Sequence, residues 1–169
     1  NLGSLDMRDL IREVAVKSRE NNREIAEIIV AESGKPLIEC LDEIEWISSI
    51  FEYYSEIGRD QKGRVVAPVT SRSISMVVKE SYGVVGCIVP WNYPLLLMAW
   101  KVAPALASGN TVVIKPSEYT PLSIMHWLQV ACDHLPAGII NMITGDGVTG
   151  SYLVEHPDTR VIAFTGSVE

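Results

Sequence analysis

The run from residue 83 to residue 118 constrains the fold of this chain more than any other part of the sequence. It holds two short apolar segments, 84–89 and 111–114, which are rich in valine and isoleucine and are bounded by Gly, Pro or Asn. Such segments are typical of buried strands, and the helical composition between them indicates a parallel βαβ unit. In a parallel sheet, ligands bind outside the carboxyl ends of the strands. The residues at those ends, 90–94 and 115–118, are therefore the first candidates for a binding site.

The rest of the chain extends this pattern into an α/β protein. Further strands are expected at 139–144 and 161–164, with helices opened by residues 120–121 and around residues 151–156. Four short strands with three helical crossovers predict a doubly wound parallel sheet. We expect residues 1–62 to form helices that pack on this sheet, residues 63–82 to form a protruding β-hairpin, and residues 83–169 to form the sheet itself. A two-stranded hairpin is marginally stable alone in water, so this one is expected to need a partner.

Composition excludes several classes of partner. The formal net charge of −7 argues against nucleic acid or an acidic membrane surface, because both attract a basic face. No apolar run approaches the ~18 residues of a membrane span, and the first residues have neither signal-peptide nor transit character. Three widely spaced cysteines (Cys40, Cys87 and Cys132) make a poor disulfide framework. A cytoplasmic protein is therefore expected, and the histidine spacing predicts no metal site.

Three motifs occur in a fixed order: PWNYP at 90–94, WKVAPALASGNTVVIKPSE at 100–118 and VIAFTGS at 161–167. Together they resemble the NAD(P)-dependent aldehyde dehydrogenase superfamily, in the branch that makes carboxylic acids, over essentially the whole chain. The resemblance implies a Rossmann-like coenzyme sheet, incomplete in this chain, with NAD+ as coenzyme and NADP+ as the alternative. It also implies an aldehyde substrate and a homodimer or homotetramer, with a hairpin like 63–82 in the subunit contact.

Residues 145–150, GDGVTG, are a literal G-x-G-x-x-G between an expected strand and an expected helix. The usual dinucleotide fingerprint places a pyrophosphate here and an acidic residue at the end of the next strand. That strand ends in FTGS, without an acid, whereas Glu118 ends the second strand of the earlier unit. We therefore expect the coenzyme to start on the strand that ends at Trp91. A plain strand–helix turn is an equally good interpretation of Gly145.

The resemblance assigns coenzyme-binding roles to particular residues. Lys115 and Glu118 would bind the adenosine ribose, and Gly147 and Gly150 would flank the coenzyme. Ser167 and the amides of the helix after it would meet the pyrophosphate. The alternatives are a solvated turn for 115–118 and a helix N-cap role for Ser167. The full set of candidate coenzyme-binding residues is Ile88, Val89, Pro90, Trp91, Lys115, Pro116, Ser117, Glu118, Gly147, Gly150, Phe164, Thr165, Gly166 and Ser167.

Two residues are candidates for catalysis. Asn92 follows a strand, where a side-chain amide can donate to a developing oxyanion. It matches the oxyanion-hole asparagine of the family, and its alternative role is to satisfy the backbone of a turn. Lys101 matches a family lysine that takes part in a proton relay, and its alternative is an ordinary lysine on a helix surface.

The resemblance places the family's cysteine nucleophile and glutamate base after the FTGS turn, outside this chain. Cys87 lies in an expected buried strand, and Cys40 and Cys132 lie in expected helices without an activating base. We therefore expect a fragment of an aldehyde dehydrogenase that works through a thioester and is inactive alone. One rival is a non-catalytic coenzyme-binding or assembly protein of the same fold. Another, a short-chain reductase built on 145–150, would need a Tyr-x-x-x-Lys pair that the sequence lacks.

Overall fold

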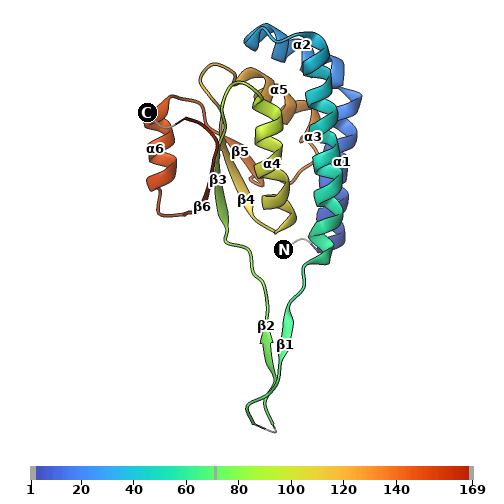
Figure 1. Cartoon of the computed structure of the whole chain (residues 1–169), viewed down its shortest axis with the longest axis vertical. Helices are drawn as coiled ribbons and strands as arrows, with labels where there is room; N and C mark the ends of the chain where they lie inside the picture. Colours follow the sequence, from blue (N-terminus) through green and yellow to red (C-terminus); the bar gives the residue numbers. More distant parts are fainter. Residues whose placement is uncertain (1–2, 71, 168–169) are drawn as a thin grey trace.

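A four-stranded parallel sheet, in the order β5-β4-β3-β6, lies at the centre of the molecule (Figure 1). The computed structural model describes residues 3–70 and 72–167 of the chain. No residue of either central strand is exposed, because helices cover both faces of the sheet. This arrangement confirms the predicted α/β, doubly wound fold. The strands are β3 (Val84–Ile88), β4 (Thr111–Lys115), β5 (Ile140–Met142) and β6 (Thr159–Phe164).

The winding of the sheet reverses beside β3. From β3 the chain passes through α4 (Pro94–Ala107) to β4, and from β4 through α5 (Leu122–Ala131) to β5. The next helix, α6 (Gly147–Glu155), returns the chain to β6 on the other side of β3. Helices α4 and α6 lie on opposite faces of the sheet (Figure 1). The carboxyl ends of β3 and β6 therefore meet at a topological switch point, where open α/β sheets bind their ligands.

Three N-terminal helices pack on the α4 side of the sheet: α1 (Ser4–Glu20), α2 (Asn22–Ser33) and α3 (Leu37–Ile57). Gly34 ends α2 in the left-handed conformation (φ 72°), as its position before a proline predicts. A short 3-10 helix, Gly58–Asp60, follows α3.

The same helices share one core with the sheet. The rings of Phe51 on α3 and Trp127 on α5 lie 5.5 Å apart between centroids. The indole N–H of Trp127 donates a hydrogen bond of 2.9 Å to Ser18 Oγ on α1. The buried polar group of this large side chain is thereby satisfied, as burial requires.

The expected hairpin forms an arm that projects away from the body (Figure 1). Its strands, β1 (Arg64–Val66) and β2 (Ser75–Val77), pair antiparallel over three residues each. This ladder is shorter than the alternation from 65 to 78 predicts. Val65 is 77% exposed and Met76 is 64% exposed. Residue 71, in the expected turn, lies outside the described residues.

The element boundaries around the glycine-rich segment differ from those expected. Helix α6 begins at residue 147, not near 151, because Asp146 caps it: its side chain accepts hydrogen bonds from Val148 N (2.9 Å) and Thr149 N (3.4 Å). Strand β5 is shorter than 139–144, and β6 begins two residues before 161. Within the described part of the chain, no helix combines the length and apolar character needed to cross a membrane.

Candidate functional site

A groove of about 740 Å³ opens at the carboxyl ends of β3 and β6, at the point where the winding reverses. Four separate segments contribute to it: the end of β3, the end of β4, the turn after β6 and one face of α6. The structure thus brings together most of the residues that the sequence assigns to coenzyme binding. The lining residues are Ile88, Val89, Pro90, Trp91, Lys115, Ser117, Glu118, Tyr119, Gly147, Gly150, Ser151, Val154, Glu155, Phe164, Thr165, Gly166 and Ser167.

Three candidate residues do not line this groove. Pro116 is buried in the turn after β4, Asn92 is exposed one residue beyond Trp91, and Lys101 lies on α4. Four lining residues were missed by sequence reasoning: Tyr119, Ser151, Val154 and Glu155. The signal for Ser151 and Val154 is their helical spacing from Gly147, which becomes visible once Asp146 is recognised as the N-cap of α6.

The end of β4 supplies one buried cation and one half-exposed carboxylate. Lys115 is only 5% exposed, so the solvated-turn interpretation is wrong for this residue. Its Nζ lies 3.8 Å from Glu118 Oε2, which is longer than a hydrogen bond. The Glu118 side chain keeps 49% of its surface exposed. An ammonium donor beside a carboxylate acceptor suits a ligand with neighbouring hydroxyl groups.

The α6 wall of the groove is low near the start of the helix, where Gly147, Gly150 and Ser151 line it. A Cβ at Gly150 would lie 3.9 Å from Ile88 Cδ1, so α6 passes close to the end of β3 here. Gly145, immediately before the α6 N-cap, has φ 149°, a conformation that residues with side chains rarely adopt. The glycine-rich segment therefore does two things: it turns the chain sharply and leaves room beside the strand ends.

The turn after β6 is tied to both β3 and α4. Thr165 N donates to Ile88 O at 3.1 Å, and Thr165 Oγ1 accepts from Lys101 Nζ at 2.5 Å. Lys101 Nζ also donates to Leu97 O at 3.1 Å. Burial lowers the pKa of Lys101 below its ordinary value, so Lys101 is not a free surface lysine. The helix start expected after Ser167 lies outside the described residues.

Asn92 lies in the short turn between β3 and α4, and both ends of this turn are held. On the strand side, Val89 N donates to Lys115 O at 3.2 Å. On the helix side, Glu43 Oε1 accepts hydrogen bonds from the first N–H groups of α4, those of Leu95 and Leu96. The exposed Asn92 amide is thus carried on a short segment with fixed ends.

All three cysteines are free and buried. Burial raises the pKa of Cys87 to about 12, an effect larger than the opposing one of nearby Lys101. Burial also raises the pKa values of Cys40 and Cys132. A thiolate is the nucleophilic form of cysteine, so none of these side chains is suited to attack a carbonyl at neutral pH.

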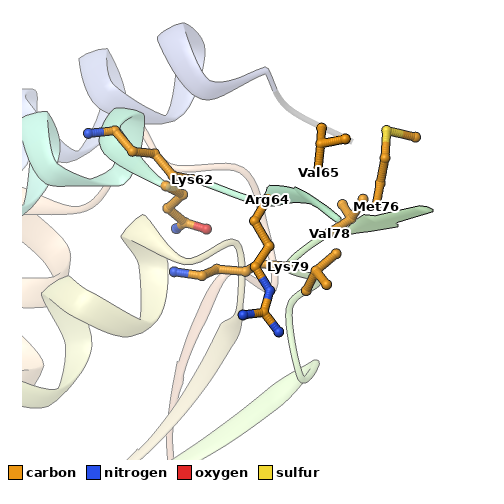
Figure 2. A pocket seen from close by; sticks show the side chains of 9 residues that line it. Lys62, Arg64, Val65, Met76, Val78 and Lys79 are labelled. Atoms are coloured by element: carbon orange, nitrogen blue, oxygen red, sulfur yellow. The ribbon is translucent and has the colours of Figure 1, made fainter. Parts of the chain in front are cut away.

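A second hollow, of about 340 Å³, lies on the hairpin arm (Figure 2). Lys62, Arg64 and Lys79 lie toward one side of it, while Val65 and Met76 lie toward the other. It is remote from the ends of the parallel strands and lacks a carboxylate among its lining residues. Among the described residues, no cluster of three or more His, Cys, Asp or Glu side chains could hold a metal ion.

Comparison with known proteins identifies similar chains. The aldehyde dehydrogenase family model matches residues 5–169. The chain is 42% identical to betaine aldehyde dehydrogenase 1 of Oryza sativa subsp. japonica over 164 residues, which are 94% of this chain and 32% of that protein. It is 43% identical to peroxisomal aminoaldehyde dehydrogenase 1 of Malus domestica over 162 residues, 93% of this chain and 32% of that protein.

Solved structures agree with these matches. A betaine aldehyde dehydrogenase variant from Staphylococcus aureus, in complex with NAD+, superimposes with a TM-score of 0.93 at 33% identity. The match covers 98% of this chain and 34% of that one. The chain therefore spans about a third of the length of the relatives that it matches.

Proposed function

Because the chain belongs to the aldehyde dehydrogenase family, we propose that it forms the coenzyme-binding part of an enzyme that oxidises an aldehyde to a carboxylic acid with NAD+. The observation that carries this proposal is the groove at the switch point, where residues from four segments of the chain meet. Such a crevice is the usual place for a dinucleotide in an open α/β sheet. When bound, NAD+ supplies the hydride acceptor of the reaction.

The residues of the groove fit this coenzyme. Lys115 and Glu118 offer a donor and an acceptor for the hydroxyls of the adenosine ribose, with NADP+ as a weaker alternative ligand. Gly147 and Gly150 leave the α6 wall low, so the coenzyme can approach the backbone closely. Thr165 and Ser167, in the turn after β6, offer hydroxyls for the pyrophosphate.

Two residues outside the groove have roles in the reaction itself. The side-chain amide of Asn92 donates a hydrogen bond to the substrate oxygen as negative charge develops on that oxygen. Lys101, whose pKa is lowered by burial, donates a hydrogen bond to Thr165 Oγ1 and is the chain's member of a proton relay. The buried cysteines are not suited to attack the aldehyde, so a nucleophile and a general base from outside this chain would complete the thioester mechanism.

The hairpin arm is the proposed subunit contact of a homodimer or homotetramer. Its apolar side chains Val65, Met76 and Val78 are largely exposed, and its strands have unpaired edges. Three free cysteines support the proposal of a reducing, cytoplasmic compartment.

Binding and turnover of the full-length protein that contains this chain test the proposal separately. Calorimetric titration with NAD+ should give a Kd that rises about 10-fold or more in Lys115→Met, because hydrogen bonds of charged groups contribute ~1.5–3 kcal/mol. Lys62→Met, on the arm, should leave this Kd unchanged. An unchanged Kd in Lys115→Met would exclude Lys115 as a coenzyme ligand.

NADH formation is then followed with betaine aldehyde, an aminoaldehyde, a semialdehyde and a simple aliphatic aldehyde. Turnover with at least one of them is expected. Binding of NAD+ without turnover of any aldehyde would favour the alternative function, a non-catalytic coenzyme-binding or assembly protein. The observation that favours this alternative is that all three cysteines are buried, and buried cysteines are not suited to act as the nucleophile.

A further inference from the structure

Two helices begin at the edge of the sheet that carries the proposed site. In neither of them does the N-cap side chain make a capping hydrogen bond. The N-cap positions of α4 and α5 are Tyr93 and Pro121, and neither makes a side-chain capping hydrogen bond. A helix N-terminus leaves its first N–H groups without partners inside the helix. In this protein, carboxylates from the N-terminal helices supply those partners: Glu43 for α4 and Glu32 for α5.

Glu43 accepts hydrogen bonds from two N–H groups in the first turn of α4. Its side chain is fully buried, and its Oε1 accepts hydrogen bonds from Leu95 N (2.9 Å) and Leu96 N (3.0 Å). Pro94, the first residue of the helix, has no N–H, and Leu97 N donates to Tyr93 O at 3.0 Å. The carboxylate therefore occupies the site where the positive end of the helix dipole favours an anion.

The other oxygen of Glu43 is held as well. Lys35 Nζ donates to Glu43 Oε2 at 2.6 Å, and the same Nζ lies 3.7 Å from the centroid of the Tyr93 ring. The rings of Trp46, on α3, and Tyr93 are 6.3 Å apart. The residue directly after Asn92 is thus packed against a cation and an aromatic ring of the N-terminal segment.

We propose that Glu43 is a positioning residue for Asn92. By holding the start of α4, Glu43 on α3 affects the catalytic rate although it contacts neither substrate nor coenzyme. This inference rests on the role proposed for Asn92. The turn that carries Asn92 is short, its strand end is fixed to β4, and its helix end is fixed by the Glu43 carboxylate. A displacement of the α4 start would therefore move the Asn92 amide away from the developing oxyanion.

Glu32 makes a parallel contact at the other helix. Its side chain accepts hydrogen bonds from Leu122 N at 2.8 Å and Ser123 N at 3.1 Å, and it also accepts from Ser123 Oγ. Helix α5 follows the turn that contains Glu118. Loss of the Glu32 contact should therefore act on coenzyme binding, whereas loss of the Glu43 contact should act on the rate.

Two conservative substitutions separate the reach of Glu43 from its charge. Glu43→Asp keeps the charge beside Lys35 but shortens the side chain by one methylene, which withdraws the acceptor from the two amides. Glu43→Gln keeps the length and one acceptor oxygen but leaves Lys35, whose side chain is 13% exposed, without its counter-ion. Removing one partner of a buried pair is strongly destabilising. If Glu43 positions Asn92, kcat should depend on the length of the side chain at residue 43. If the role of Glu43 is purely structural, the loss in kcat should instead parallel the loss in stability.

The experiment compares full-length wild type, Glu43→Asp, Glu43→Gln and Glu45→Gln by kcat, Kd for NAD+ and Tm. Glu45, an exposed residue of α3 that bonds Arg19, provides the control. Glu43→Asp should lower kcat by about 10²-fold, the effect of a misplacement of about 1 Å, with Kd for NAD+ unchanged. Glu43→Gln should retain most of kcat and yet show the larger fall in Tm. Glu32→Asp should instead raise Kd for NAD+.

The outcomes are distinguishable. Normal kcat in Glu43→Asp, in a protein whose wild type is active, would overturn the positioning role alone. The same conclusion would follow if the losses in kcat ranked in the same order as the losses in Tm. A wild type that forms no NADH with any aldehyde would overturn the proposed function and, with it, this role of Glu43.

Discussion

The side chain of Lys101 on α4 donates a 2.5 Å hydrogen bond to Thr165 Oγ1, in the turn that follows β6. The two residues are 64 positions apart in the chain. Their contact joins the helix that follows the Asn92 turn to the end of the groove formed by Thr165 and its neighbours. It therefore connects the two halves of the proposed site, one catalytic and one coenzyme-binding.

Lys101 should make stability depend on pH in the alkaline range. Its pKa is lowered by burial from the ordinary 10.5, so between the folded value and 10.5 the unfolded chain binds more protons than the folded one. The stability of wild type relative to Lys101→Met should therefore rise with pH through that window and be constant below it. The measurement is Tm from pH ~7 to pH ~10 for both proteins, with Lys62→Met as control. A difference in Tm that is independent of pH would contradict the burial of this ammonium.

Asn92→Ala should lower kcat by about 10²–10³, the usual effect of losing one oxyanion donor. The oxyanion exists only after attack on the aldehyde, so the Kd for NAD+ should be unchanged. Steady-state kinetics and calorimetry of the full-length protein give the two quantities. Asn141→Ala, at an exposed position of β5, is the matched control. Near-normal kcat in Asn92→Ala would return Asn92 to a role in the turn.

Glu118→Gln should narrow the preference for NAD+ over NADP+. The carboxylate accepts hydrogen bonds from ribose hydroxyls and repels a 2′-phosphate at the same place. The ratio of kcat/KM for the two coenzymes measures the preference. Glu155→Gln removes the same charge from the α6 wall and should leave the ratio unaltered. If both variants behave alike, the effect belongs to the overall charge of the groove and not to Glu118.

The three cysteines should react slowly with iodoacetamide in the folded chain. With a pKa of about 12, Cys87 is thiolate in only about one molecule in 10⁴ at pH ~8, and all three thiols are buried. Labelling in urea provides the fully reactive reference.

Because its cysteines are buried thiols, the 169-residue chain alone should form no NADH with any aldehyde. Turnover by that chain, abolished by replacing a single cysteine with Ala, would identify a nucleophile among them.

Charged substitutions on the arm should weaken subunit association. Met76→Glu and Val78→Glu each place a carboxylate on the exposed apolar surface proposed as the contact. Sedimentation velocity of the full-length protein should then show smaller species than wild type. Val16→Glu, at a partly exposed position of α1, is the control. An unchanged oligomer for both arm variants would exclude this contact.

Local sequence determined the parts of the protein that depend on neighbours in the chain. Apolar runs bounded by Gly, Pro and Asn were enough to predict β3 and β4 almost to the residue. A continuous short apolar run is typical of a buried strand, and the bounding residues mark where the strand ends. Motifs at those strand ends predicted roles for Lys115, Glu118 and Asn92, and the structure places the first two in one groove. The start of α6 was misplaced because the capping role of Asp146 competes, in sequence, with the interpretation of GDGVTG as a loop.

Only the tertiary structure decided which distant residues meet. Nothing in the local pattern says that β6 lies beside β3, that the Lys115 side chain is buried, or that Lys101 reaches Thr165. The contact between Glu43 and Leu95 joins residues 52 positions apart. In the sequence, Glu43 cannot be told from any other acidic residue on a helix. Periodicity along a chain reports which face of an element is buried, but not what covers it. The partners of a buried charge are set by the packing of whole elements, and they appear only when the helices and the sheet come together.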